Sequence, residues 1–137
     1  NSVDWRGLLA PSLAVFEQMA DESWRRLPAR FRELCGEVVV RVEDFAEDEV
    51  LDELDIEDAF ELMGLYQGVS LDKRSLSDLP QTPSMIFLYR RPILDHWAEG
   101  EETLGELITH VLVHEVGHHF GLSDADMEAI EDEAIAT

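Results

Sequence analysis

Apolar positions in this chain follow helical spacing near both ends and form short runs between them. In the first segment they recur at helical intervals, at Leu9, Leu13, Phe16, Ala20 and Leu27. This spacing predicts an amphipathic helix over residues 11–27, because Pro11 is tolerated near a helix start. Pro28 opens a second, short helical piece, which Gly36 ends.

Runs of β-branched and apolar residues in the middle of the chain predict strands. Residues 37–42 are rich in valine, and residues 85–90 form a continuous, mainly apolar run. We expect the second strand to be buried and to stop at Pro92, with a short helix around 93–97. Residues 64–71, which contain two glycines, are typical of a strand or an extended turn.

An acidic stretch and a polar loop lie between these runs. Residues 43–61 carry many carboxylates and no basic residue, but apolar residues interrupt them. This pattern favours short amphipathic helices with a solvated acidic face. The D-x-D-x-D-G spacing of a calcium loop is missing. Residues 72–84 contain Pro80 and Pro83 and predict a surface loop long enough to overhang a cleft.

Two helices near the C-terminal end are predicted by their caps as well as by their apolar faces. Thr103 and Glu106 form a T-x-x-E capping box before a strong helical pattern, and Gly121 is suited to end that helix. Ser123 and Asp126 repeat the capping pattern. The face of the last helix that we expect to be buried carries Met127, Ile130 and Ala134.

The length and the net charge of the chain limit its number of domains and the partners it can bind. The chain has 137 residues without a repeat or a flexible linker, so we expect residues 1–137 to form one compact α+β domain. Its 31 Asp and Glu residues outnumber 10 Lys and Arg residues, giving a formal net charge of −21. Nucleic acid and anionic membranes are therefore poor partners, whereas basic peptides or proteins are favoured. A simpler consequence of this charge is a soluble monomer.

Cysteine usage and the absence of targeting patterns bear on location. Cys35 is the only cysteine, so a disulfide framework and a cysteine metal cluster are excluded, and we expect it in the core. The sequence shows no leader pattern and no apolar run of the roughly 18 residues that a membrane span needs. We expect a cytoplasmic protein.

The stretch H-E-V-G-H-H-F-G-L-S-D carries the chemistry that can be read from the sequence. On a helix, His114 and His118 share one face, so their imidazoles can converge on one Zn²⁺ ion. Glu115 can serve as a general base beside the metal. Gly121 can turn the chain back with a positive φ, so that Asp124 supplies a third ligand. This motif predicts a zinc hydrolase site with one open position.

Other interpretations of the same residues are open. The histidines can be merely exposed on an amphipathic helix, and Asp124 can be an acid that the dipole of the last helix favours. His119 lies about 140° around the helix from His114, and His110 lies about 12 Å along it from His118. We therefore do not expect His119 or His110 to bind the same ion. A surface position is expected for His110, with lining of the cleft or a hydrogen bond to a ligand as the alternative.

Residues outside the motif have less specific assignments. Tyr66 and Tyr89 are candidate donors to a developing oxyanion, with no predicted position. Arg90 and Arg91 are expected to pair with the acidic surface. Met127 fits either core packing or a place beneath the metal.

The motif resembles that of the small bacterial zincin-like metallopeptidase family, also described as minimal metzincin-like proteins. Two upstream blocks, residues 64–68 and 87–94, are similar to the family as well, and residues 27–42 are similar more loosely. The resemblance covers most of residues 25–130. It implies a compact zincin-like domain in which a small mixed sheet packs against the active-site helix.

The resemblance also implies a ligand set and a function. It assigns His114, His118 and Asp124 as zinc ligands and Glu115 as the catalytic base. The leading hypothesis is a zinc-dependent peptidase whose extended substrate, enriched in basic residues, pairs with a strand edge in residues 85–90 or 64–70. The alternative is a catalytically weak zinc-binding adaptor for a basic partner, because metzincins proper have a histidine where Asp124 stands and a Met-turn that is not recognisable here. Hydrolysis of a non-peptide amide is a third possibility.

Overall fold

A computed structural model describes residues 5–67 and 84–136. Apart from Ser84, the predicted loop at 72–84 lies outside the described residues, as does the second half of the predicted strand at 64–71. The helices are η1 (Trp5–Gly7), α1 (Leu13–Arg26), α2 (Ala29–Cys35), α3 (Asp48–Glu53), η2 (Ala59–Glu61), α5 (Arg90–Glu99), α6 (Leu104–Gly117), η3 (His118–Phe120) and α7 (Asp124–Ala136). The strands are β1 (Val38–Glu43), β2 (Gly64–Gln67) and β3 (Ser84–Tyr89).

Helices α1 and α2 confirm the two predicted helices, although Leu9 and Leu13 of the apolar spacing are exposed. α1 follows Ser12, whose Oγ accepts a hydrogen bond from the backbone N–H of Val15 at 3.2 Å. Its inner face buries Phe16 and Ala20. α2 ends at Gly36, whose φ of 71° is a left-handed conformation that glycine adopts without strain.

Both predicted capping boxes are present. The Oγ1 of Thr103 accepts from the backbone N–H of Glu106 at 3.1 Å, and the Glu106 carboxylate accepts from the backbone N–H of Thr103 at 3.2 Å. Ser123 and Asp126 exchange the same two hydrogen bonds, each at 3.1 Å. These bonds satisfy backbone N–H groups that a helix start leaves without partners, so they fix where α6 and α7 begin.

The strands form a mixed sheet in the order β1-β3-β2. β1 runs parallel to β3, and β2 runs antiparallel to it. The central strand buries Ile86 and Leu88, as its apolar sequence predicts. Because β3 has a neighbour on each side, the prediction that residues 85–90 offer an edge to a peptide is wrong. Among the described residues, β2 has one edge without a partner strand.

The chain changes from strand to helix earlier than predicted. β3 ends at Tyr89 and α5 begins at Arg90, so Pro92 lies in the first turn of a helix and not at the end of a strand. Proline fits there because the backbone N–H groups of a first turn have no partner inside the helix. The short helix predicted at 93–97 is therefore the middle of a longer one.

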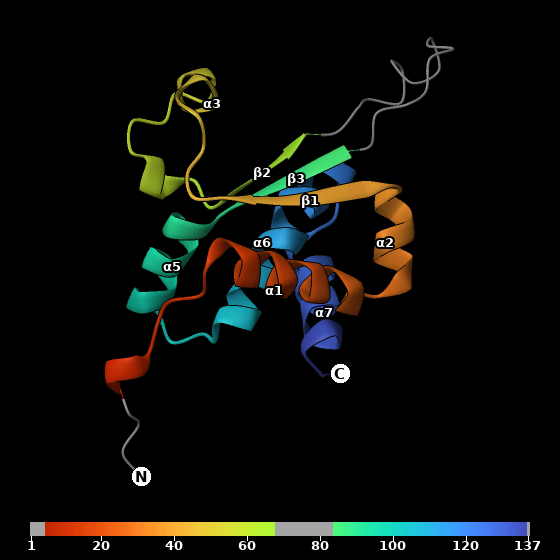
Figure 1. Cartoon of the computed structure of the whole chain (residues 1–137). Coiled ribbons are helices and arrows are strands. Elements are labelled where there is room, and N and C mark those ends of the chain that lie inside the picture. Colours follow the sequence, from red (N-terminus) through yellow and green to blue (C-terminus); the bar gives the residue numbers. More distant parts are fainter. Residues whose placement is uncertain (1–4, 68–83, 137) are drawn as a thin grey trace.

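Helix α6 lies at the centre of the fold (Figure 1). It contacts β2 and β3 as well as α1, α5 and α7. In Figure 1, α1 and α7 lie on the same side of the sheet as α6, and α2 and α3 lie beyond opposite ends of β1. The apolar side chains of α6 supply much of the main core. They are Leu104, Leu107, Ile108, Val111, Leu112, Val113 and Val116. The burial of α6 on several sides fixes the helix that carries the motif. These features confirm the predicted α+β fold with a small mixed sheet packed against that helix.

A second, smaller apolar cluster joins the acidic stretch to the sheet. Leu51 of α3 and Ala46 pack with Tyr89 at the end of β3. The acidic side chains of α3 are exposed, whereas Leu51 is buried. The prediction of short amphipathic helices within residues 43–61 is therefore confirmed by α3 and η2.

None of the helices in the described part of the chain is long and apolar enough to cross a membrane. The longest of them, α1 and α6, have 14 residues each. A helix that spans the hydrocarbon core of a bilayer needs about 20 residues.

Candidate metal centre

The motif residues lie where α6 ends and the chain turns back into α7. His114 and Glu115 belong to the last turn of α6, and His118 begins the short helix η3. Gly121 adopts φ 76°, in the left-handed region, as the sequence predicts for the residue that ends this segment. Asp124 is the first residue of α7. This position at the start of α7 is compatible with both interpretations of Asp124, as a metal ligand and as a helix-start acid.

His114 and His118 lie on the same side of this segment. Their ring centroids are 5.7 Å apart, and His114 is half-buried whereas His118 is exposed. Burial lowers the pKa of His114, and repulsion from His110 and His118 lowers it further, although the Glu131 carboxylate opposes these effects. A neutral imidazole has the free lone pair that a metal ion needs.

Glu115 is half-buried. Burial raises the pKa of its carboxyl group from 4.5 to about 7. A Cβ added to Gly64 of β2 would lie 3.1 Å from Cγ of Glu115, so the edge strand packs directly on this side chain. The Glu115 carboxylate also adds to the raised pKa of Tyr89, about 12, whose main cause is burial. The base candidate therefore lies between the helix, the edge strand and the end of β3.

A pocket of about 330 Å³ adjoins the other side of the motif. His114 and Asp124 both line it, as the predicted ligand set requires. Its other lining residues, which include no part of His118, are Glu102, Glu106, His110, Glu128, Glu131, Asp132 and Ile135. The structure therefore brings two of the three predicted ligands to one cavity, and the complete ligand set stays a prediction.

The group of possible metal ligands that the described residues form differs from the predicted one. Nδ1 of His110 lies 2.7 Å from Oε1 of Glu131, and Nε2 of His114 lies 3.3 Å from Oε2 of the same carboxylate. One ligand atom from each residue lies within 4.8 Å of both others. Among the described residues, His114, His118 and Asp124 do not form such a group.

Sequence reasoning missed Glu131 and expected His110 at the surface. His110 does line a cleft, which is the alternative that the sequence left open. A signal for the pairing exists in the chain, since His110 and Glu131 lie at nearly equal distances on the two sides of Gly121. In a hairpin of two helices such residues come opposite each other. Which side chains face across the hairpin depends on the rotation of each helix about its axis, and the sequence does not specify that rotation.

The remaining candidates have structural contacts. The Tyr66 hydroxyl donates to Oγ of Ser84 at 3.2 Å, and its ring contacts that of His119, with centroids 4.7 Å apart. His119 is exposed and packs its ring against Tyr66. Arg90 pairs with Asp44 at 3.0 Å, as expected for a cation beside the acidic surface.

Two buried side chains confirm expectations about the core. Burial raises the pKa of the Cys35 thiol to about 12, so this cysteine is protonated at neutral pH and is no nucleophile. Met127 is fully buried against Gly117, where an added Cβ would lie 2.8 Å from its Cγ. Met127 therefore packs the core under the residue that precedes His118.

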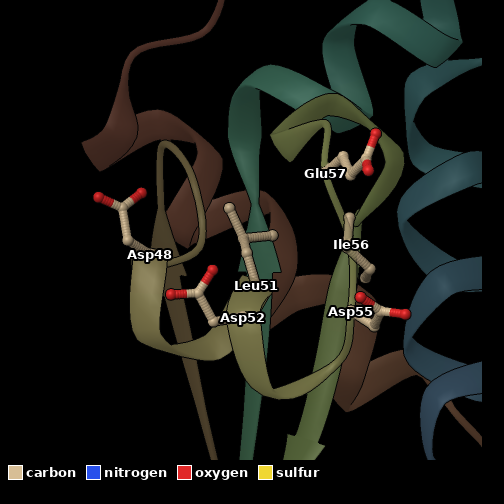
Figure 2. A pocket seen from close by; sticks show the side chains of 6 residues that line it. All are labelled: Asp48, Leu51, Asp52, Asp55, Ile56 and Glu57. Carbon is tan, nitrogen blue, oxygen red and sulfur yellow. The ribbon is translucent and has the colours of Figure 1, made fainter.

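A larger pocket lies away from the motif, at α3 (Figure 2). It has a volume of about 490 Å³ and is lined by Asp48, Leu51, Asp52, Asp55, Ile56 and Glu57. In Figure 2 the Asp48 and Asp52 side chains extend to one side of it, and those of Asp55 and Glu57 to the other. No histidine or cysteine lines it, so it lacks the nitrogen or sulfur ligands that zinc prefers.

A helix with H-E-x-x-H, packed under the edge strand of a small mixed sheet and followed by a glycine turn and an acid, defines a zincin-like domain. A family model for zincin-like metallopeptidases matches residues 35–134. The chain belongs to the zincin-like metallopeptidase family. Membership implies a metal ion, usually zinc. The comparison with curated proteins finds no match.

Proposed function

We propose that this chain is a zinc-dependent peptidase in which Glu115 acts as the general base. One observation carries the proposal: Glu115 follows the metal-ligand candidate His114 on α6 and packs against the edge strand β2 at Gly64. A base, a metal ligand and a strand that can hold an extended peptide thus belong to adjacent parts of the fold. Family membership supports the same reaction class.

The residue types of the predicted ligand set suit a zinc ion. His114, His118 and Asp124 would hold it, which is the two-imidazole, one-carboxylate donor set of many catalytic zinc sites. His114 and Asp124 line the same cavity. When bound, Zn²⁺ supplies Lewis acidity, which polarises the scissile carbonyl group and makes an attacking water more acidic.

Glu115 performs the proton transfers in this proposal. Its carboxylate takes a proton from the attacking water and later gives it to the nitrogen of the leaving amine. Its half-buried position keeps bulk water from competing for the proton. The packing of β2 on its side chain holds the carboxylate in place between the two transfers.

The substrate is an extended peptide that pairs with the edge of β2 (Gly64–Gln67) that has no partner strand among the described residues. Backbone hydrogen bonds to an edge strand supply affinity without regard to sequence. Specificity then comes from charge, because the chain carries a formal net charge of −21 and the pocket beside the motif is lined by several carboxylates. We expect basic residues near the scissile bond to be preferred.

A panel of matched peptides that differ only in Lys or Glu near the scissile bond tests both the activity and the preference. The zinc-loaded chain is expected to cleave the Lys peptides faster, with the difference shrinking as salt is raised. A chelator should stop cleavage and added zinc should restore it. Cleavage that resists the chelator contradicts the metal-dependent mechanism. Equal or reversed rates for Lys and Glu peptides contradict the charge preference alone.

Metal analysis tests the ligand set. Zinc bound per chain is measured after dialysis against a weak chelator in a His110→Ala background, because His110, His114 and Glu131 could otherwise hold an ion themselves. Adding His114→Ala or Asp124→Ala to this background is expected to lower the bound zinc. Equal zinc with and without Asp124→Ala removes Asp124 from the ligand set and leaves it as the helix-start acid of α7.

The net charge favours a second candidate, a zinc-binding adaptor that holds a basic partner without hydrolysing it. The two candidates differ in what Glu115→Gln does. A peptidase loses hydrolysis and keeps its zinc, whereas an adaptor has no hydrolysis to lose and keeps its partner. Non-peptide amides in the same panel address the third possibility.

A further inference from the structure

Helix α6 carries two overlapping pairs of histidines at i, i+4 spacing. His114 and His118 form the pair within the family motif, and His110 and His114 form the other. The rings of His110 and His114 are closer together than those of the motif pair, with centroids 4.0 Å apart against 5.7 Å. The proposed peptidase mechanism gives His110 no role.

Glu131 of α7 forms a group of three possible metal ligands with His110 and His114. Its carboxylate spans the two rings, with Oε1 2.7 Å from Nδ1 of His110 and Oε2 3.3 Å from Nε2 of His114. The Glu131 side chain is only 13 % exposed, so the hairpin of α6 and α7 holds it in place. The three residues come from two helices that pack on each other, and their backbones are fixed by the main core.

We propose that His110, His114 and Glu131 form a second binding site for a divalent transition metal such as Zn²⁺ or Co²⁺. Two imidazoles and one carboxylate are a donor set that binds zinc with a water in the fourth position. Ligand atoms about 2.1 Å from a tetrahedral ion lie about 3.4 Å from one another. The three ligand atoms already lie within 4.8 Å of one another, so small changes in side-chain torsion angles would complete the site.

The pocket around the site suits a cation. Glu128 and Asp132, on the same helix as Glu131, line it together with Glu106 of α6. Their carboxylates raise the local concentration of divalent cations without having to bind them directly. The opening of the pocket also gives an ion a route to the three ligands.

His114 belongs to both this site and the motif pair, so binding at one affects the other. A neutral imidazole has one unprotonated nitrogen, so His114 serves one ion at a time. An ion held by His110, His114 and Glu131 therefore withdraws His114 from the motif pair. The two sites are alternatives at this residue, although the second site does not require that the chain hydrolyse anything.

Titration of metal-free protein with Co²⁺, followed by visible absorption, tests the second site. His118→Ala removes the motif pair and leaves the second site intact; His118 is exposed, so the variant should fold. We expect His118→Ala to bind one Co²⁺ per chain. Adding Glu131→Gln or His110→Ala to it should weaken that binding about 100-fold or more.

The matched control is Glu128→Gln in the same His118→Ala background. Glu128 lies in the same pocket and the same helix, and its substitution removes the same charge without removing a ligand. Binding should change by no more than about threefold, the size of a screened surface charge effect. Each variant is first shown to keep the far-UV circular dichroism of the wild type.

Two results would overturn the inference. A folded His118→Ala that binds no Co²⁺ shows that the second site does not exist. Equal weakening by Glu131→Gln and Glu128→Gln shows that Glu131 acts only through its charge. Because no step measures hydrolysis, these outcomes are independent of whether the chain is a peptidase.

Discussion

A methyl group added at Gly64 in β2 would lie 3.1 Å from Cγ of Glu115 in α6. It would also lie 2.8 Å from Cγ1 of Val111, one turn earlier on the same helix. The absence of a side chain at Gly64 therefore lets the edge strand rest on the helix that carries the proposed base. The close approach links the stability of the sheet edge to the position of Glu115.

Gly64→Ala is therefore expected to destabilise the fold by about 1–3 kcal/mol, since the buried contact has to open. It should also lower any peptidase rate more than stability alone accounts for, because Glu115 is displaced. Denaturant unfolding measures the first effect. Gly105→Ala is the control: an added Cβ there meets nothing within 4 Å, so we expect no loss and a gain of up to about 1 kcal/mol from helix propensity. Equal effects at the two glycines would contradict the account.

Gly117 makes a similar close approach to Met127 across the α6–α7 hairpin. Gly117→Ala forces its Cβ towards Cγ of Met127, which is 2.8 Å away and fully buried, and should cost about 1–3 kcal/mol. Met127→Ala removes the obstruction at the cost of a cavity. In that background, Gly117→Ala should cost clearly less. A double-mutant cycle measures the coupling, and additive effects would show that Met127 is not the obstruction.

The metal-free protein should lose stability as the pH rises, through Glu115. The folded pKa of about 7 lies above the ordinary 4.5, so folding favours the protonated carboxyl group. Its stabilising contribution is complete below about pH 4.5 and is lost by about pH 7. Between pH 5 and pH 8 the wild type should lose about 2–3 kcal/mol relative to Glu115→Gln, at 1.36 kcal/mol per pKa unit.

Chemical unfolding with a chelator present, at several pH values, measures this difference between the wild type and Glu115→Gln. The comparison removes the contributions of other titrating groups, His114 among them, because both proteins share them. Parallel stability curves for the two proteins would contradict the burial of Glu115 as a cause of pH dependence.

Features that depend on local chemistry were predictable from the sequence. The Thr103–Glu106 capping box is an example, because both of its hydrogen bonds join residues three apart. The left-handed glycine at 121 is another. Features that depend on distant partners were not predictable. The apolar run at residues 85–90 predicts that β3 is buried, but it does not predict which strands lie beside it, since the order of strands depends on pairing between remote segments.

In the candidate site, too, the features set by local sequence were predictable and those set by distant partners were not. H-E-x-x-H makes His114 and Glu115 candidates from the sequence alone, because the proposed chemistry depends on spacing along one helix. The contact of Glu131 with His110 and His114 arises where two helices pack together, and helix rotation decides it. The packing of Gly64 on Glu115 likewise requires the sheet to be formed first.

Peptide hydrolysis by zinc-loaded Glu115→Gln, compared with the wild type at equal bound zinc, tests the central claim most directly. The amide cannot accept the proton of the attacking water, so the rate should fall about 10²–10⁴-fold while the bound zinc is unchanged. Glu22→Gln, at an exposed acid on α1 that does not line the pocket beside the motif, should keep the wild-type rate within about threefold. A Glu115→Gln variant that hydrolyses peptides at the wild-type rate would contradict the assignment of Glu115 as the general base.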